Sequence, residues 1–510
     1  MIKSFTSYNS NIRGRVIVLF LLFLLAIYLL ATSGLTNFAA VCLIPAIALF
    51  LFLSFKHQNA LFWYIFAMNY FVMGLQRYEY IPVPVTVVTV LPQLLLVMTI
   101  IINPKGNKNS LATPMLLAIF LWTFYLVIQV FNETCGLPLS IGDWIMNLNF
   151  YAFYFILAYV LVSKIINTPE NIMRFLRIWA WFSIVATFWA WRQKTFGWDQ
   201  TEWRWLLGGA MRTHIVGGSI RYFSFFSDAA TFGCNMGASA ALFYILGLTS
   251  KLRKDKIFFS ITGLFCTYSF FASGTRSGLL CFMAGIALYV FLAKSLKLTM
   301  TVLASTCAFI FFLAFTDIGN GNMQIRRMRT AFDTNDASKN VRDINKESIK
   351  KYLKDAPYGF GINIDEGRIP RFNKFKKVLD TPNDSTYVFF WQRTGIVGVY
   401  VFASMNIIIL LGGCFISFFK LQNKACKGIS AAICCGFIGI QAGGYANHIL
   451  LQYPNIILFY GSMAIVYLLP AIEPEYIAYE EKKYAEYEEK KRLKKEKQEK
   501  LRVKKLFRWT

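Results

Sequence analysis

The chain is dominated by long apolar blocks of about 17–22 residues, the length at which a helix spans the ~30 Å hydrocarbon layer of a membrane. Within such a layer the backbone must satisfy its own polar groups, and a helix does so within one segment. The sequence therefore predicts an all-α fold, a polytopic bundle of about 12–14 transmembrane helices. The predicted spans are 16–31, 37–55, 60–75, 84–102, 113–131, 148–163, 175–191, 229–249, 256–273, 277–293, 298–316, 388–419, 427–446 and 452–470.

Composition agrees with a membrane protein. Of 510 residues, 56% are hydrophobic and only 16% are charged, whereas a soluble domain carries about 25% charged residues. The opening segment places Lys3, Arg13 and Arg15 ahead of an apolar block, as a signal peptide does. No small-x-small cleavage site follows, so this block is expected to be retained as the first span.

The formal net charge of +26 does not indicate nucleic-acid binding, because the basic residues lie in short loops and in a tail. Alternating the spans from a cytoplasmic start places these basic loops inside, as the positive-inside rule requires. Both termini are then cytoplasmic. The expected location is the bacterial inner (cytoplasmic) membrane, with multiple passes.

This topology divides the chain into six segments. We expect N-terminal transmembrane helices over 1–191 and an extracytoplasmic loop rich in Trp and Arg over 192–228, whose Trp residues are typical of an interfacial belt. Further spans with an Arg276 turn follow over 229–316. A large extracytoplasmic loop with short helices occupies 317–387, including an amphipathic helix over 343–355. The C-terminal spans occupy 388–470, and a charged helical tail occupies 471–510.

Cysteine and histidine give no sign of a metal site. Most of the 10 Cys fall inside apolar spans, where they read as small core residues. The three histidines, His57, His214 and His448, do not cluster in sequence, and none has a carboxylate at ligand spacing. The sequence therefore predicts no metal and no cofactor.

Two arginines stand at the outer ends of predicted spans, against the positive-inside bias. Arg221 precedes a Phe-rich turn and Arg276 lies within Gly274-Thr-Arg-Ser-Gly278. A cation held at a bilayer edge marks a functional site with an anionic partner. Two other readings stay open: Arg221 pairs with Asp228, and the two glycines, four residues apart, serve close helix packing. Thr275 and Ser277 flank Arg276 and are positioned to support its guanidinium.

A carboxylate stands just before another span, in Thr381-Pro-Asn-Asp-Ser-Thr-Tyr387. Asp and Asn before a helix are commonly N-caps. A carboxylate at a membrane-edge cleft is also a candidate general base toward a hydroxyl nucleophile. Local sequence leaves both readings of Asp384 open.

Taken in order, these segments resemble the O-antigen ligase / O-antigen polymerase family of bacterial membrane glycosyltransferases. The matching elements are Arg221-Tyr-Phe-Ser-Phe-Phe-Ser-Asp228, Gly274-Thr-Arg-Ser-Gly278, Pro357-Tyr-Gly-Phe-Gly361 and Gly395-Ile-Val-Gly398. Tyr387 keeps the family's spacing to Gly395. The family's His and Asn fall on Asp384 and Ser385, so this chain departs from the pattern at the position of the base. The resemblance covers about residues 210–410.

The resemblance implies a donor glycan carried on a polyprenyl pyrophosphate, transferred at the outer face of the membrane to a hydroxyl of a glycan, lipid or protein, without metal or cofactor. Arg221 and Arg276 would bind the pyrophosphate, with Arg212 as a third contact. Ser277, Asn383 and Tyr387 would contact substrate, and Asp384 would deprotonate the attacking hydroxyl. Polymerase, ligase and protein O-glycosylation enzyme stay open as alternatives. A rival of another class is a lipid-linked oligosaccharide flippase.

Overall fold

The computed structural model describes residues 28, 52, 55–78, 85–102, 111–136, 140–216, 218–330, 337–363, 370–373 and 375–506. The first two predicted spans, 16–31 and 37–55, therefore lie almost wholly outside the described residues. The chain divides into two units: residues 1–62 with 94–105, and residues 63–93 with 106–510. The first unit contributes the start of α2 (Gln58–Tyr78) and the end of α3 (Val85–Ile102). All that follows concerns the second unit.

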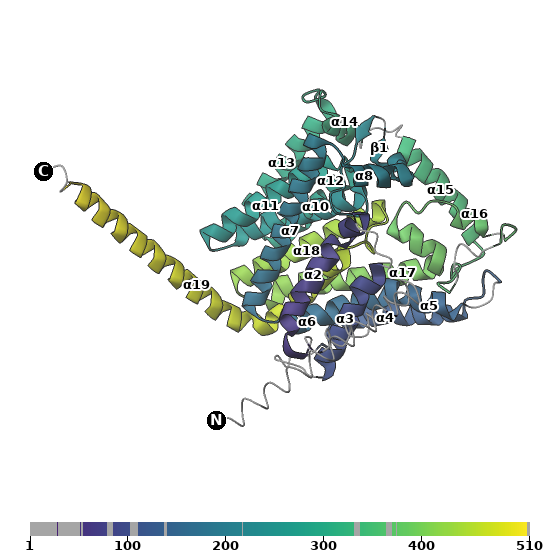
Figure 1. The fold of residues 1–510 in the computed structure, drawn as a ribbon, viewed down its shortest axis with the longest axis horizontal. Helices are drawn as coiled ribbons and strands as arrows, with labels where there is room; N and C mark the ends of the chain where they lie inside the picture. Colours follow the sequence, from purple (N-terminus) through teal and green to yellow (C-terminus); the bar gives the residue numbers. More distant parts are fainter. Residues whose placement is uncertain are drawn as a thin grey trace. The chain divides into compact units, whose positions relative to one another are not determined.

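The second unit is almost entirely helical, which confirms the all-α prediction (Figure 1). In the part of the chain that the structure describes, strands are limited to the short antiparallel pair β1 (Ile215–Val216) and β2 (Ser219–Ile220). The helices are α4 (Pro114–Ile128), η1 (Gln129–Phe131), α5 (Ile141–Leu148), η2 (Asn149–Phe153), α6 (Tyr154–Ile165), α7 (Pro169–Phe196), α8 (Gln200–Trp205), η3 (Leu206–Ala210), α9 (Met211–His214), α10 (Ala229–Thr249), α11 (Arg253–Ala272), α12 (Arg276–Leu292), α13 (Leu296–Phe315), α14 (Met323–Arg329), α15 (Ala337–Leu353), α16 (Lys376–Leu379), α17 (Thr386–Phe415), η6 (Ile416–Lys420), α18 (Lys424–Ala446), η7 (Ile456–Tyr460) and α19 (Gly461–Leu506).

Seven helical stretches of the described residues are long and apolar enough to cross a membrane, so the protein is a multi-pass membrane protein. They are Pro114–Phe131, Ile141–Ile165, Pro169–Phe196, Ala229–Thr249, Thr386–Lys420, Lys424–Ala446 and Ile456–Leu493. Three shorter apolar helices are Val88–Ile102, Arg276–Leu292 and Thr299–Phe315. The span predicted over 229–249 has the bounds of α10. The total of 12–14 spans stays a prediction.

Helix α10 is the most enclosed of these spans and packs against α11, α12 and α18. Small residues permit this packing. A side-chain carbon at Gly237 would collide with the carbonyl oxygen of Gly278, and one at Gly278 would lie 2.6 Å from the carbonyl oxygen of Gly233. Helices in lipid associate through such close backbone approach rather than through apolar burial alone. Gly278 therefore has the packing role that its sequence context suggested.

The large loop of residues 317–387 has a core of its own. Its buried apolar side chains lie on α15, on the segment that follows it and on α16. They include Ile349, Leu353, Phe360, Phe375 and Val378. The amphipathic helix expected over 343–355 lies within α15, with Ile349 and Leu353 buried but Ile344 exposed. The loop is thus a packed layer, with a defined face toward the ends of the membrane helices.

The last helix extends well beyond the bundle. Helix α19 begins inside the apolar core and continues through the charged tail to Leu506. In Figure 1 its C-terminal part is the yellow helix that runs alone toward the chain end. Its side chains after Tyr476, which is buried, are mostly exposed.

Candidate functional site

The hairpin after α9 places Arg221 against the turn that carries Arg276. The backbone N–H of Arg221 donates to the His214 carbonyl at 2.9 Å. One guanidinium nitrogen of Arg221 donates to the Thr213 carbonyl, and the other donates to Thr275 Oγ1, both at 2.8 Å. Thr275 directly precedes Arg276. One hydrogen bond, from Arg221 to the residue before Arg276, therefore joins the two segments that carry the selected arginines.

His214 supports this hairpin from inside. Its Nδ1 lies 2.8 Å from the Ala210 carbonyl oxygen, and its Nε2 accepts the N–H of Ala229 at 3.3 Å. The ring therefore carries its proton on Nδ1 and is neutral. Burial lowers the pKa of His214 to about 4, which agrees with that state. His214 is a structural residue that joins the hairpin to the start of α10.

Arg276 is the first residue of α12, and it follows a turn that needs glycine. Gly274 has φ = +58°, a left-handed conformation that other residues adopt at a cost. The hydroxyl of Thr275, the N-cap residue, makes no cap bond to α12. It donates instead to the Ala229 carbonyl at 2.8 Å. The first-turn N–H groups of α12 therefore lack a side-chain cap, and such an end favours negative charge.

The large loop is bound to the same turn. Arg327 of α14 donates from Nε to the Gly274 carbonyl at 2.6 Å. Arg276 in turn donates to the Thr330 carbonyl at 3.1 Å. These bonds bring α14 and its arginines over the start of α12. Sequence reasoning did not select Arg327, because nothing in its local context separates it from the neighbouring Arg326 and Arg329.

Asp384 is not the N-cap of α17. Ser385 takes that role, since its hydroxyl accepts from the N–H groups of Tyr387 and Val388 at 3.1 and 3.4 Å. Asp384 is left one residue outside the helix, where its Oδ2 accepts from Asn345 Nδ2 of α15 at 3.1 Å. The cap reading is therefore wrong for Asp384. Its neighbour Asn383 has a buried Oδ1 that lacks a hydrogen-bond partner among the described residues.

The first part of α17 ends at a break at Gly395, and hydrogen bonds from the large loop hold the helix at this break. Gly395 has φ = +66° within the helix, and a side-chain carbon there would collide with the Pro357 carbonyl oxygen. The carbonyl groups of Gln392 and Arg393, freed by the break, accept from the N–H groups of Phe360 and Gly361 at 2.9 and 2.8 Å. The Pro357–Gly361 element is thus a backbone clamp on the break, and both glycine motifs have a structural cause.

The turn that follows α18 lies between the start of α12 and the start of α17. Asn447 Nδ2 donates to Ser277 Oγ, beside Arg276. The Asn447 carbonyl accepts from the N–H of Thr386 at 3.2 Å, and Thr386 Oγ1 accepts from the N–H of Ile449 at 3.1 Å. The turn of residues 447–449 therefore joins the start of α12 to the start of α17. It brings His448, which sequence reasoning passed over, to the same place.

The Arg221 hairpin, the Arg276 turn, α14, Asp384 and the turn after α18 line one open cleft with a volume of about 990 Å³, while the Gly395 break and its clamp lie outside the lining. Five arginines line it: Arg212, Arg221, Arg276, Arg327 and Arg342. The carboxylates are two, Asp228 and Asp384, and Asp228 is occupied as the N-cap of α10, accepting from Ala230, Thr231 and Ser227. Histidines 214 and 448 and the polar residues Ser277, Asn383 and Asn447 complete the polar lining. Positive charge therefore dominates the cleft.

Arg221 has a strongly perturbed electrostatic environment. Burial, and next the nearby positive charge of Arg327, lower the pKa of Arg221 to about 10. Its Nε is buried without a hydrogen-bond partner among the described residues. A bound anion would relieve both penalties, because it supplies an acceptor and an opposite charge.

The cleft brings together six of the seven selected residues: Arg212, Arg221, Arg276, Ser277, Asn383 and Asp384. Tyr387 is not part of its lining. The Tyr387 hydroxyl donates to Gln441 Oε1 at 3.4 Å, and its ring packs against Phe402. Arg327, Arg342, Asn447 and His448 were not selected. No local signal separates them from ordinary loop residues, since only the tertiary fold brings them to the cleft.

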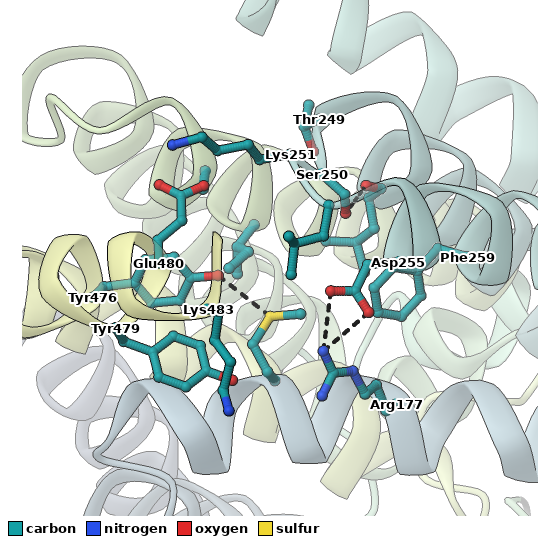
Figure 2. Close-up of a pocket in the computed structure, with 15 residues that line it drawn as sticks. Arg177, Thr249, Ser250, Lys251, Asp255, Phe259, Tyr476, Tyr479, Glu480 and Lys483 are labelled. Atoms are coloured by element: carbon teal, nitrogen blue, oxygen red, sulfur yellow. Dashed lines mark hydrogen bonds and ion pairs between the residues drawn. The ribbon is translucent and has the colours of Figure 1, made fainter. Parts of the chain in front are cut away.

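A second cavity lies elsewhere in the unit and is far smaller, about 50 Å³ (Figure 2). Figure 2 shows Arg177 pointing at Asp255, where one guanidinium nitrogen donates to both carboxylate oxygens at 3.0 Å. The Tyr476 hydroxyl meets the sulfur of Met173 at 3.3 Å. This void has room for one or two waters, and its principal charges are paired. In the part of the chain that is described, no group of three His, Cys, Asp or Glu side chains is placed to hold a metal ion.

A match to a known protein family covers part of the sequence that lines the cleft. Residues 261–403 match the model of the O-antigen ligase family. The matched region contains the Arg276 turn, the Pro357–Gly361 element, Asp384 and the α17 break, while Arg212, Arg221 and His448 lie outside it. No curated protein matches the chain. Residues 261–403 of this membrane protein are therefore similar to the O-antigen ligase family, which supports the resemblance that the sequence predicts.

Proposed function

We propose that the protein is an integral membrane glycosyltransferase. It transfers or polymerises a glycan from a polyprenyl-pyrophosphate donor onto a hydroxyl acceptor, at the outer face of the bacterial inner membrane. The observation that carries the proposal is the cleft of five arginines, which gathers family motifs from segments far apart in the chain. A lipid-linked pyrophosphate is a small, doubly charged anion, and guanidinium groups bind it through paired hydrogen bonds.

In this reaction an acceptor oxygen forms a bond to the anomeric carbon as the bond from that carbon to the pyrophosphate oxygen breaks. The bonding electrons leave with the lipid pyrophosphate. Arg221 and Arg276 bind this leaving group, with Arg212 as a further contact, and fixed cations of this kind stabilise the charge that develops in the transition state. Since arginine supplies the charge, transfer is expected to continue in the presence of a metal chelator.

The acceptor hydroxyl must lose its proton during attack. Asp384 is the base that the sequence offers; Asn345 donates a hydrogen bond to its carboxylate, and Asp384 lines the same cleft as Arg276. Ser277 and Asn383, which also line the cleft, are assigned contacts to the sugars. Tyr387 does not line the cleft. We therefore assign it a contact to substrate only if the acceptor is long enough to extend beyond the cleft.

The position of the cleft argues for transfer rather than transport. Its charged residues lie at helix ends: Asp228 before α10, Arg276 at the start of α12 and Asp384 before α17. A flippase is expected to keep charged residues within several spans, lining a central cavity. Alternation of the spans from a cytoplasmic start places these helix ends outside, with both chain termini in the cytoplasm.

The test uses the purified full-length protein in liposomes with a lipid-linked glycan donor. Arg276→Ala is expected to lower transfer by at least about 100-fold, the usual cost of losing a donor to the transition-state charge. Arg204→Ala is the control, because Arg204 of α8 is an exposed arginine that does not line the cleft. Wild-type glycan products from Arg276→Ala would refute the assignment.

The acceptor is identified in cells. If a deletion strain carries single repeat units attached to the acceptor, the protein is a polymerase. If it accumulates long polymer on the lipid carrier, the protein is a ligase.

A further inference from the structure

His448 lies in the turn of residues 447–449, which joins the start of α12, with Arg276, to the start of α17, next to Asp384. It follows Asn447, which bonds to Ser277 beside Arg276, and it precedes Ile449, whose N–H bonds to Thr386 of α17. Its imidazole packs on the ring of Phe389, with centroids 4.4 Å apart. Contacts on both sides therefore fix this side chain, which lines the cleft with Arg276 and Asp384.

The hydrogen-bonding state of His448 differs from that of the structural His214. Both ring nitrogens of His214 have backbone partners. In His448, Nδ1 is buried and lacks a partner among the described residues. A buried polar nitrogen without a partner costs free energy and calls for an explanation, such as a catalytic role.

The surroundings of His448 keep the ring neutral at neutral pH. Burial, followed by the positive charge of Arg393 on α17, lowers the pKa of His448 to about 4, while Asp228 at the start of α10 opposes the shift. Arg276 at the start of α12 and Asp384 before α17 line the same cleft. A donor that brings two negative charges would raise this pKa again, toward the neutral range in which a general base works best.

We propose that His448 is a catalytic residue of the transfer site and accepts the proton of the attacking acceptor hydroxyl. This inference rests on the proposed function and reassigns one role within it. Asp384, already bonded to Asn345, then binds and orients the acceptor sugar rather than taking its proton.

The step balances without any further reactant. The acceptor oxygen forms the new bond to the anomeric carbon, and its proton passes to an unprotonated nitrogen of His448. The bond to the pyrophosphate oxygen breaks and the electron pair leaves with the lipid pyrophosphate. The imidazolium returns its proton to solvent after the products depart.

The test measures single-turnover transfer by the full-length protein in liposomes, across pH 5–9. We expect His448→Ala to lower the rate by at least about 100-fold, with the KM for the lipid-linked donor nearly unchanged. Added imidazole should restore much of the rate, because it can occupy the vacated space as a free base. The fall of the rate at acid pH should disappear from His448→Ala and persist in Asp384→Asn.

Two controls complete the design. His57→Gln replaces an exposed histidine and should leave both the rate and the pH profile unchanged. The thermal stability of each variant is measured in parallel. A wild-type rate in His448→Ala overturns the inference. So does a rate loss that imidazole does not restore, or an acid limb that disappears in Asp384→Asn instead. None of these results touches the proposed function, which fails only if Arg276→Ala keeps wild-type transfer.

Discussion

The large cleft and the small cavity beside Arg177 both contain arginine, yet they differ in what surrounds it. In the small cavity, Arg177 meets both oxygens of Asp255 at 3.0 Å, and the void holds little more than water (Figure 2). In the large cleft, Arg221 meets a carbonyl and a hydroxyl, and its Nε has no described partner. Paired charge in a filled space is typical of structure. An excess of arginine over carboxylate around an open space is typical of an anion-binding site.

The most direct test of this difference between the cavities is to remove one arginine from each. Arg221→Ala should lower glycan transfer by about 100-fold or more, because a fixed donor to the leaving group is lost. Arg177→Ala should leave transfer per folded molecule unchanged and cost about 1 kcal/mol or less of stability, since the Arg177 side chain is 41% exposed. Product gels and thermal melting of both variants measure the two effects. Equal losses of transfer would erase the distinction between the cavities.

A second prediction concerns the wall of the cleft. Gly395→Ala should destabilise the protein by about 2–4 kcal/mol, because it adds left-handed strain and a collision with the Pro357 carbonyl. Thermal melting in detergent measures the loss. The control is Gly142→Ala in α5, where a side-chain carbon has nothing within 4 Å. If the two variants melt together, the Pro357–Gly361 clamp does not secure the break.

A third prediction concerns the pH dependence of stability that His214 contributes. The folded pKa of His214, about 4, lies below its ordinary value of 6.5, so the unfolded chain binds a proton first as the pH falls. Stability should therefore be full above pH 6.5 and decrease between pH 6.5 and 4, by at most about 1.4 kcal/mol per pH unit for this residue. His214→Gln should make the fall of the melting temperature across that window shallower, and His448, whose pKa is also lowered to about 4, accounts for the part that remains. A profile as steep as that of the wild type would show that His214 does not contribute.

Much of the fold follows from the sequence because spans are set by length and apolarity, which are local properties. The bounds of α10, α12 and α18 could be predicted closely for this reason. Only some of the residues that line the site could be predicted from the sequence. Arg221 and Arg276 stand out because they oppose a topological rule. Arg327 and His448 obey every local rule, and only the packing of α14 and of the turn after α18 brings them to the cleft.

The break at Gly395 also fixes how deep the chemistry lies. The helix from residue 396 to 419 rises about 36 Å at ~1.5 Å per residue, so it crosses the ~30 Å hydrocarbon layer without help from the turns before the break. Residues 386–394 are therefore not needed to cross that layer, and with the proposed topology we expect them and Asp384 to lie in the headgroup region. A lipid-borne diphosphate would therefore reach the arginines at its own natural depth, with its isoprenoid tail still dissolved in the bilayer.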